Sequence, residues 1–364
     1  MIPPKDAVRS EEFINYFSYK YQEPVGSEPF FINLKVGDVV WDTTHKLIQI
    51  GIQTKKPEIE KLPPSNFVFL LDVSGSMNDS DKLPLLKQSL KLLTNQLRDE
   101  DRVSIVVYAG SAGLVLDRAK GTQKEKIINA LDNLEAGGST AGGEGIELAY
   151  EIAKKSFISN GNNRVILATD GDFNVGVSSE SALISLIEEQ RKSGVYLSVL
   201  GFGGGNYKDD TAELLADKGN GNYSYIDTLL EAKKVLVSQM SGTLYTVAKD
   251  VKIQVEFNPK KVYTYKLLGY ENRALANEDF NDDKKDAGEI GMGHSVTALY
   301  EVVLNDGTNG SSSVDKLKYQ TQNTTTQSDS NELATLKLRY KEPMGENSKL
   351  INLSSIKPKA KQFP

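Results

Sequence analysis

The feature that most constrains the fold is an alternation of apolar runs with helical patterns between residues 65 and 245. Continuous apolar runs are typical of parallel strands buried on both faces, and helices usually connect such strands. The pattern therefore predicts a doubly wound, mainly parallel α/β sheet. The expected strands are Phe67–Leu71, Val103–Tyr108, Val165–Thr169 and Val195–Gly201, and the expected helices are Leu83–Arg98, Lys124–Leu134, Gly145–Ser156, Ser181–Lys192 and Leu229–Met240.

The residues on either side of this region have a pattern richer in β-strands. A short helix is expected at Ser10–Phe17, with Ser10 as its cap. Neither flank has enough strands to stand alone, so we expect residues 1–63 and 246–364 to form one β-rich unit into which the α/β domain of residues 64–245 is inserted. The expected strands are Phe31–Val36, Leu47–Thr54, Val251–Phe257, Val262–Leu268, Val296–Leu304 and Ala334–Tyr340.

Polar side chains follow several of the expected parallel strands. They are Asp72, Ser74 and Ser76 after the first strand, Thr140 in a glycine-rich segment, and Asp170 at the end of the third strand. In an open parallel sheet, ligands bind where the carboxyl ends of the strands open into loops, so these segments can converge. Every side chain that they contribute is an oxygen donor, which predicts a site for a hard divalent cation.

The donor set narrows the choice of metal. It has two carboxylates and three hydroxyls, with no His and no Cys. Calcium usually takes about 6–8 oxygens with more acidic groups, whereas Mg²⁺ and Mn²⁺ accept octahedral oxygen sets and retain waters. Two carboxylates neutralise the ion, so an open coordination position would still attract an anion. We therefore expect Mg²⁺ (or Mn²⁺) and a protein partner that presents Asp or Glu.

A simpler interpretation of the same residues is structural. Asp and Ser are common at helix N-termini, where their oxygens accept backbone N–H groups. Asp72 and the serines would then cap the helix expected to begin near Leu83. That interpretation leaves Thr140 and Asp170 without a role, and the metal site accounts for all three segments.

The five residues resemble the metal-ion-dependent adhesion site (MIDAS) of von Willebrand factor type A (VWA) domains. That family has an Asp-x-Ser-x-Ser motif, a Thr in a second loop and an Asp before Gly in a third, and all five positions match here. The resemblance covers the predicted α/β domain. It implies that Ser74, Ser76 and Thr140 supply hydroxyls and that Asp72 and Asp170 bind the ion directly or through water. It also implies a non-enzymatic, adhesion-type function.

The flanks resemble those of a bacterial subfamily of VWA proteins. Members of that subfamily are generally associated with the cell envelope, often as lipoproteins, and their molecular roles are mostly uncharacterised. The resemblance implies a location in the cell envelope or at the extracellular face. The abrupt chain ends fit a longer precursor, which could carry a signal segment or a lipid anchor. The matching segments are Arg9–Phe17, Trp41, His45–Leu47, Gly269–Arg273, Asp286–Gly291 and Gly293–Glu301.

Composition excludes several other classes of function. The chain of 364 residues has a formal net charge of −6 and a pI of about 5.3, so nothing suggests a nucleic-acid surface. It has no cysteine, which removes disulfides, thiol catalysis and cysteine zinc sites. No stretch approaches the length of ~18 apolar residues that a membrane span requires.

Two alternatives to an adhesion module remain open. One is a scaffold or assembly subunit of a cell-envelope complex. The other is a metal-assisted hydrolase. No nucleophile elbow of the Gly-x-Ser-x-Gly type surrounds Ser74, Ser76 or Ser139, and the only histidines, His45 and His294, lie in the flanks, so we expect no enzyme.

A few further residues could have a role. The run Gly201–Gly205 follows a strand, but it falls too late in the domain for a dinucleotide fingerprint. Asp172 could orient a metal-bound water, although a loop-capping role is the simpler interpretation. We expect His294 to be a hydrogen-bonded turn residue rather than a ligand. We expect Trp41, the only Trp, to pack at the junction of the β unit.

Overall fold

The computed structural model divides into two compact units. Residues 57–247 and 288–293 form one of them, called here the α/β unit, and residues 1–56, 248–287 and 294–364 form the other, called the β unit. The structure describes residues 9–26, 28–56, 58, 61–138, 142–171, 180–204, 209–270, 274–285, 287–305, 325–343 and 345–356.

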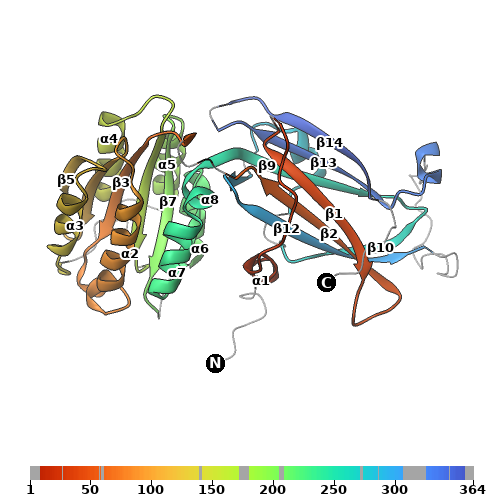
Figure 1. Cartoon of the computed structure of the whole chain (residues 1–364), viewed down its shortest axis with the longest axis horizontal. Coiled ribbons are helices and arrows are strands. Elements are labelled where there is room, and N and C mark those ends of the chain that lie inside the picture. Colours follow the sequence, from red (N-terminus) through yellow and green to blue (C-terminus); the bar gives the residue numbers. More distant parts are fainter. Residues whose placement is uncertain are drawn as a thin grey trace. The chain divides into compact units, whose positions relative to one another are not determined.

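The α/β unit contains a six-stranded sheet of order β5-β4-β3-β6-β7-β8. Figure 1 labels its strands β5, β3 and β7. All neighbouring pairs are parallel except β4 and β5, which are antiparallel. The central strand β3 is buried along its whole length, as its continuous apolar run predicts. The strands are β3 (Ser65–Asp72), β4 (Arg102–Tyr108), β5 (Ala112–Lys120), β6 (Asn162–Thr169), β7 (Val195–Phe202) and β8 (Tyr223–Ile226).

Helices cover both faces of this sheet, and each face has its own hydrophobic core. Alternate residues of β3 enter the two cores: Phe69 faces the core of α2, α3 and the last helix, and Leu70 faces the core of α4, α5 and α6. The expected doubly wound α/β fold is confirmed. The helices are α2 (Leu83–Gln96), α3 (Lys124–Asp132), α4 (Gly142–Lys155), α5 (Glu180–Arg191), α6 (Asp209–Lys218), α7 (Leu229–Lys233) and α8 (Met240–Leu244).

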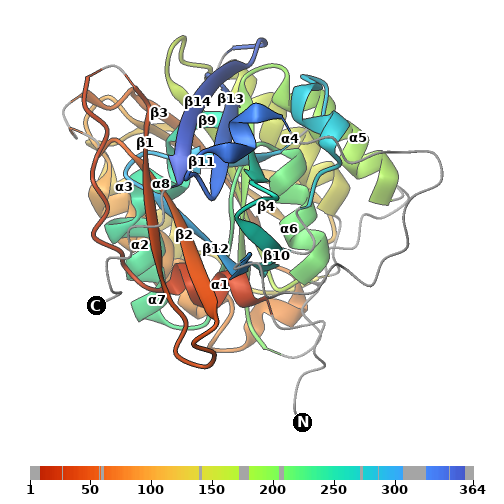
Figure 2. The ribbon, with the colours of Figure 1, turned by 90° about the vertical axis from the view of Figure 1, so that its right-hand side faces the viewer.

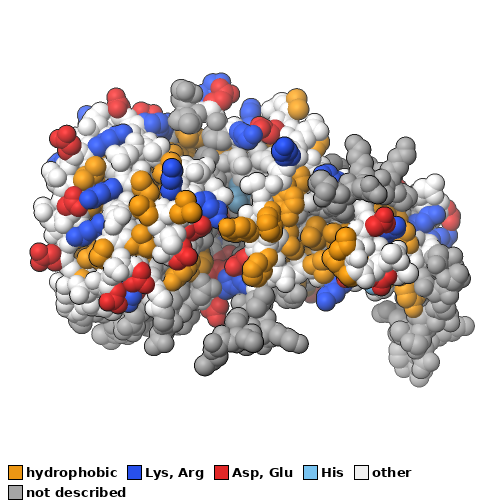
Figure 3. All heavy atoms as spheres, turned by 60° about the horizontal axis from the view of Figure 1, so that its bottom comes forward, with side chains coloured by type: hydrophobic (Ala, Val, Ile, Leu, Met, Phe, Trp, Pro, Cys, Tyr) orange, Lys and Arg blue, Asp and Glu red, His pale blue; other side chains and the backbone are white. Residues whose placement is uncertain are grey.

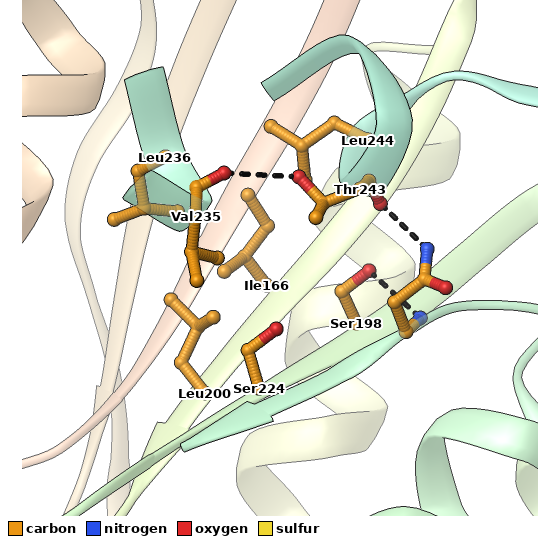
Figure 4. A pocket seen from close by; sticks show the side chains of 9 residues that line it. Ile166, Ser198, Leu200, Ser224, Val235, Leu236, Thr243 and Leu244 are labelled. Carbon is orange, nitrogen blue, oxygen red and sulfur yellow. Dashed lines mark hydrogen bonds between the residues drawn. The ribbon is translucent and has the colours of Figure 1, made fainter. Parts of the chain in front are cut away.

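The last helical segment is interrupted. A π-helical turn, Lys234–Ser238, separates α7 from α8, where the sequence pattern predicts one continuous helix. Beneath it lies a small pocket against β6, β7 and β8 (Figure 4). The Thr243 hydroxyl donates to the carbonyl oxygen of Val235 at 3.2 Å, and the Asn222 side chain donates to the carbonyl oxygen of Thr243 at 2.7 Å. The first bond joins the two parts of the interrupted helix, and the second ties the helix to the residue that precedes β8.

The β unit joins strands from both ends of the chain, as expected. One antiparallel sheet has the order β1-β2-β12-β10 (Figure 2). In it, β2 pairs with β12 so that Ile50 lies opposite Ala298. In a second antiparallel arrangement, β13 pairs with both β9 and β14. The elements are α1 (Ser10–Tyr16), β1 (Phe30–Asp38), β2 (His45–Thr54), β9 (Thr246–Phe257), β10 (Val262–Leu268), β12 (Ser295–Leu304), β13 (Ala334–Lys341) and β14 (Lys349–Ile356), while β11 (Gly288–Gly291) belongs to the α/β unit.

Two expectations for the β unit are wrong. Ser10 is the first residue of α1 rather than its cap; the cap position is Arg9, which makes no side-chain capping bond. Trp41 does not pack: it is 63% exposed, and its indole N–H donates to Glu301 Oε1 at 3.0 Å. The polar edge of the indole finds a carboxylate, so the ring stays at the surface.

In the described part of the chain, no helix is both long and apolar enough to span a membrane. Figure 3 shows acidic and basic side chains interspersed over the face that it draws, with no concentration of one sign.

Candidate metal centre

The metal-site motif begins at the carboxyl end of β3. Asp72 is the last residue of that strand, and its Oδ1 accepts the backbone N–H of Ser74 at 2.9 Å. The hydroxyls of Ser74 and Ser76 lie 3.0 Å apart. A short 3₁₀ turn follows at Gly75–Asn78, so the chain turns sharply and keeps the carboxylate and both hydroxyls together.

The third expected segment lies beside the first because β3 and β6 are paired in parallel. Asp170 follows directly after β6. Its neighbour Thr169 has its hydroxyl 3.5 Å from Asp72 Oδ2, and the same hydroxyl accepts the N–H of Gly171 at 3.2 Å. The structure thus brings Asp72, Ser74, Ser76 and Asp170 to one edge of the sheet.

Thr140 lies outside the described residues, as does Asp172. The described part of the glycine-rich segment is bonded to the motif loop: Gly137 N–H donates to the carbonyl oxygen of Val73 at 2.8 Å, and Gly75 N–H donates to that of Gly138 at 3.1 Å. The two loops are therefore joined by backbone hydrogen bonds at the edge where Asp72 lies.

A glycine in α4 controls how closely that helix approaches the site. A Cβ built on Gly145 would lie 3.0 Å from Tyr108 Cβ and 3.2 Å from Leu70 Cδ1. Both contacts are tighter than ordinary side-chain packing allows. The absence of a side chain at residue 145 lets α4 pack directly on β3 and β4 beneath the metal-site loops.

The buried carboxylate of Asp72 is electrostatically unfavourable without a cation. Asp72 is fully buried, and burial raises the pKa of its carboxyl from 3.8 to about 6, although hydrogen bonds with Ser74 oppose the shift. The nearby Asp170 charge adds to the increase. Tyr108 is also fully buried, and burial raises the pKa of its phenol, which stays neutral beside Asp72.

Asp170 has a cationic partner within the chain. Its side chain is 3% exposed, and Oδ2 accepts Lys82 Nζ at 2.9 Å. The same ammonium donates to the carbonyl oxygen of Ser76 at 3.0 Å. Lys82 precedes the first residue of α2, and no side chain caps that helix. The alternative interpretation of Asp72 and the serines as caps of this helix is therefore wrong.

The described residues fit a small, hard cation. Among the parts of the chain that the structure describes, no group of three or more His, Cys, Asp and Glu side chains is placed to share an ion. The site instead combines two carboxylates with hydroxyls, which suits Mg²⁺ or Mn²⁺ better than a carboxylate-rich Ca²⁺ site. A lysine ammonium bound to Asp170 and to the motif loop shows that this edge of the sheet attracts positive charge.

Sequence reasoning missed Lys82, Tyr108 and Thr169. Tyr108 and Thr169 end apolar runs and are indistinguishable there from core residues. The sequence gives only a weak indication that Lys82 belongs to the site: Lys82 directly follows Asp79, Ser80 and Asp81 and is six residues from Ser76. Only the fold places it next to Asp170, which is 88 residues away in the chain.

Comparisons with known proteins agree with the fold. Residues 66–239 match the family described as the von Willebrand factor type A domain, and residues 1–49 match one described as von Willebrand factor. Residues 242–363 match a family described as the C-terminal part of the uncharacterized protein YfbK. The chain is a VWA-domain protein with subfamily-specific flanks.

Among its relatives, the uncharacterized protein YfbK of Escherichia coli (strain K12) is 47% identical over 362 residues, which are 96% of this chain and 62% of that protein. The uncharacterized protein sll0103 of Synechocystis is 28% identical over 190 residues, covering 52% of this chain and 44% of that protein. The chain thus spans less than two thirds of either relative.

A solved structure shows the same fold. The von Willebrand factor type A protein from Catenulispora acidiphila covers 92% of this chain and 75% of its own, with a TM-score of 0.50 and 15% identity. At that identity the likeness concerns the fold alone.

His45 and His294 both lie in the β unit, and the backbone carbonyl of His294 accepts the Thr54 N–H at 3.0 Å, consistent with a structural role for this segment.

Proposed function

We propose that the protein is a non-enzymatic binding module that captures a carboxylate of a protein partner through Mg²⁺ or Mn²⁺. Asp72, Ser74, Ser76 and Asp170 would hold the ion, together with Thr140. The VWA domain supports an interaction-type function, and VWA homologues are mostly non-catalytic. The observation that carries the proposal is the convergence of two buried carboxylates and the serine hydroxyls at the carboxyl edge of the sheet.

The metal would supply the positive charge that attracts the partner. Two carboxylates balance a divalent ion, and hydroxyls add no charge, so the ion keeps an affinity for one further anionic oxygen. The residues of this chain position the oxygen ligands. The Ser74 N–H orients the Asp72 carboxylate, and the turn that follows Asp72 keeps the Ser74 and Ser76 hydroxyls 3.0 Å apart.

Isothermal titration calorimetry tests the metal directly. We expect Mg²⁺ or Mn²⁺ to bind the wild-type protein and not Asp72→Ala. Asp117→Ala is a matched control, because Asp117 is an exposed carboxylate on the edge strand β5, paired with its neighbour Arg118. Equal binding by wild type and Asp72→Ala would contradict the assignment of the site.

Capture of the partner needs a second experiment. The immobilised protein should retain a defined partner in Mg²⁺ and release it in EDTA, and the Asp72→Ala variant should not retain it. Substituting the acidic residues of that partner by amides should abolish capture. Retention that is unaffected by EDTA would favour a metal-independent scaffold instead.

We also propose a location in the cell envelope or at the extracellular face, which rests on the resemblance of the flanks. Fractionation of cells that express the complete protein tests it. Recovery only with cytoplasmic proteins would contradict this part of the proposal.

A further inference from the structure

Lys82 lies where a metal-site cation is expected. Its ammonium is bound at 2.9 Å by Asp170 Oδ2 and at 3.0 Å by the carbonyl oxygen of Ser76. The first belongs to a proposed metal ligand, and the second belongs to the backbone of the motif loop. The Lys82 side chain is 15% exposed, so it is directed into the site rather than into solvent.

The fold makes room for this side chain. Gly203 follows β7 with a φ of +78°, and a Cβ built there would lie 2.5 Å from Lys82 Cε and 2.6 Å from Lys82 Cγ. Any side chain at residue 203 would therefore displace the lysine stem. The loop is held in place because the Tyr225 hydroxyl donates to the carbonyl oxygen of Gly203 at 2.9 Å and Asp81 Oδ2 accepts the Gly204 N–H at 3.3 Å.

The Lys82 ammonium compensates the buried negative charge of Asp170, which a bound metal ion would also do. A buried carboxylate such as that of Asp170 requires a counter-charge or hydrogen-bond donors. Lys82 provides both in the structure. A divalent ion bound by Asp170 would provide them as well, but two cations on one carboxylate would repel each other at short range. The metal and the ammonium would therefore compete for the Asp170 carboxylate.

We infer that Lys82 is a tethered cation that exchanges with the divalent metal. It neutralises Asp170 while the metal is absent, and it must swing out of the site when the metal binds. Its flexible four-carbon stem allows this movement. The inference rests on the proposed metal-dependent function and adds a control of metal affinity: the ion binds only as tightly as its competition with Lys82 allows.

Calorimetry with Mg²⁺ on the full chain tests the competition. Lys82→Met removes the ammonium but keeps an unbranched stem, and we expect it to bind Mg²⁺ more tightly than wild type by about tenfold, a usual size for coupling between two binding events. Lys91→Met is the matched control: Lys91 lies on α2 and forms an ion pair with Asp132, and its loss should leave the Mg²⁺ affinity within about twofold of wild type.

Gly203→Ala provides an independent variant with no change of charge. Its methyl group would meet the Lys82 stem and push the ammonium away from Asp170, so we expect it too to bind Mg²⁺ more tightly than wild type. In EDTA, Lys82→Met should unfold at a lower temperature than Lys91→Met, because it removes the ion pair between Lys82 and the buried Asp170 carboxylate, whereas the ion pair of Lys91 is more exposed.

Lysine labelling measures the movement itself. In EDTA, the Lys82 ammonium should react slowly with an amine-acylating reagent, and Mg²⁺ should raise its labelling several-fold, as read by peptide mass spectrometry. Lys192, whose side chain is 71% exposed, serves as the internal control and should not change. Labelling of Lys82 that is unchanged by saturating Mg²⁺ would overturn the inference.

The outcomes separate the inference from the proposed function. Mg²⁺ binding by wild type with equal or weaker binding by Lys82→Met would refute the exchange and leave the metal site intact. Absence of Mg²⁺ and Mn²⁺ binding in wild type, Lys82→Met and Gly203→Ala alike would refute both.

Discussion

Asp72→Asn should make the metal-free protein more stable, although the same change should abolish metal binding. The Asp72 carboxylate is fully buried, and the Lys82 ammonium bonds to the neighbouring Asp170 carboxylate rather than to Asp72. An amide has nearly the same shape, can accept the Ser74 N–H through its oxygen, and carries no charge to bury. A residue retained for function at a cost in stability behaves in this way.

The size of the effect follows from the raised pKa. Burial moves the pKa of the Asp72 carboxyl from 3.8 to about 6. A difference of about two units corresponds to about 3 kcal/mol of folding free energy, which is an upper bound because an amide does not reproduce every hydrogen bond. We expect a gain of about 1–3 kcal/mol, or roughly 3–10 °C in the melting temperature of a unit of this size.

The sign of the pH dependence is a further test. An acid whose pKa is higher in the folded state holds its proton more tightly when folded, so the free energy of unfolding falls as pH rises through this range. The penalty is therefore complete above about pH 6 and absent below pH 3.8. Asn imitates the protonated form, so the advantage of Asp72→Asn over wild type should shrink as the pH falls from about 7.5 to 4.

Calorimetric melting in EDTA, at several pH values, provides the measurement. Asp170→Asn is the informative comparison, because it breaks the ion pair with Lys82 and should lower the melting temperature under the same conditions. Saturating Mg²⁺ should raise the melting temperature of wild type but not that of Asp72→Asn. A lower melting temperature for Asp72→Asn than for wild type in EDTA at neutral pH would refute the reasoning.

Three further predictions concern the framework. Arg98→Met should lower the free energy of unfolding, measured by denaturant titration, by about 2–4 kcal/mol. The reason is that Arg98 pairs with the buried Asp101 and donates to the backbone carbonyls of residues 62 and 63. A loss below about 0.5 kcal/mol would contradict this prediction. The hydrogen bond that His45 donates to the Glu301 carboxylate raises the pKa of His45. The stabilisation from this bond should therefore be complete below pH 6.5 and be lost as the pH rises through the raised pKa. His45→Gln should accordingly lower the denaturation midpoint, followed by Trp fluorescence, at about pH 6 more than at about pH 8.5; a difference independent of pH would oppose this. Residues 246–364 expressed alone lack β2, the partner of β12, and should show no cooperative melting transition; a sharp transition would show that they fold without the N-terminal flank.

The sequence by itself determined the elements with long, uniform patterns. The strands beginning at Ser65, Arg102, Asn162 and Val195 were predicted from continuous apolar runs, which are typical of a parallel sheet covered on both faces. The strands beginning at Ala112 and Tyr223 were missed because edge strands are short or largely exposed, and their side chains do not record one buried face. Helix α6 was missed for a similar reason: its ten residues are largely polar.

Only the tertiary structure decided the environment of the site, namely the burial of Asp72 and the ion pair between Lys82 and Asp170. Asp72, Ser74, Ser76 and Asp170 were predicted as a group because parallel strands end at one edge of a sheet, a rule that needs no side-chain contact. The burial that raises the pKa of Asp72 depends on packing from both faces of the sheet. The ion pair of Lys82 with Asp170 joins residues 88 positions apart, through a space that a glycine after β7 leaves open. Sequence patterns record the period of an element and the chemistry of its ends, whereas contacts between distant residues exist only once the chain has folded.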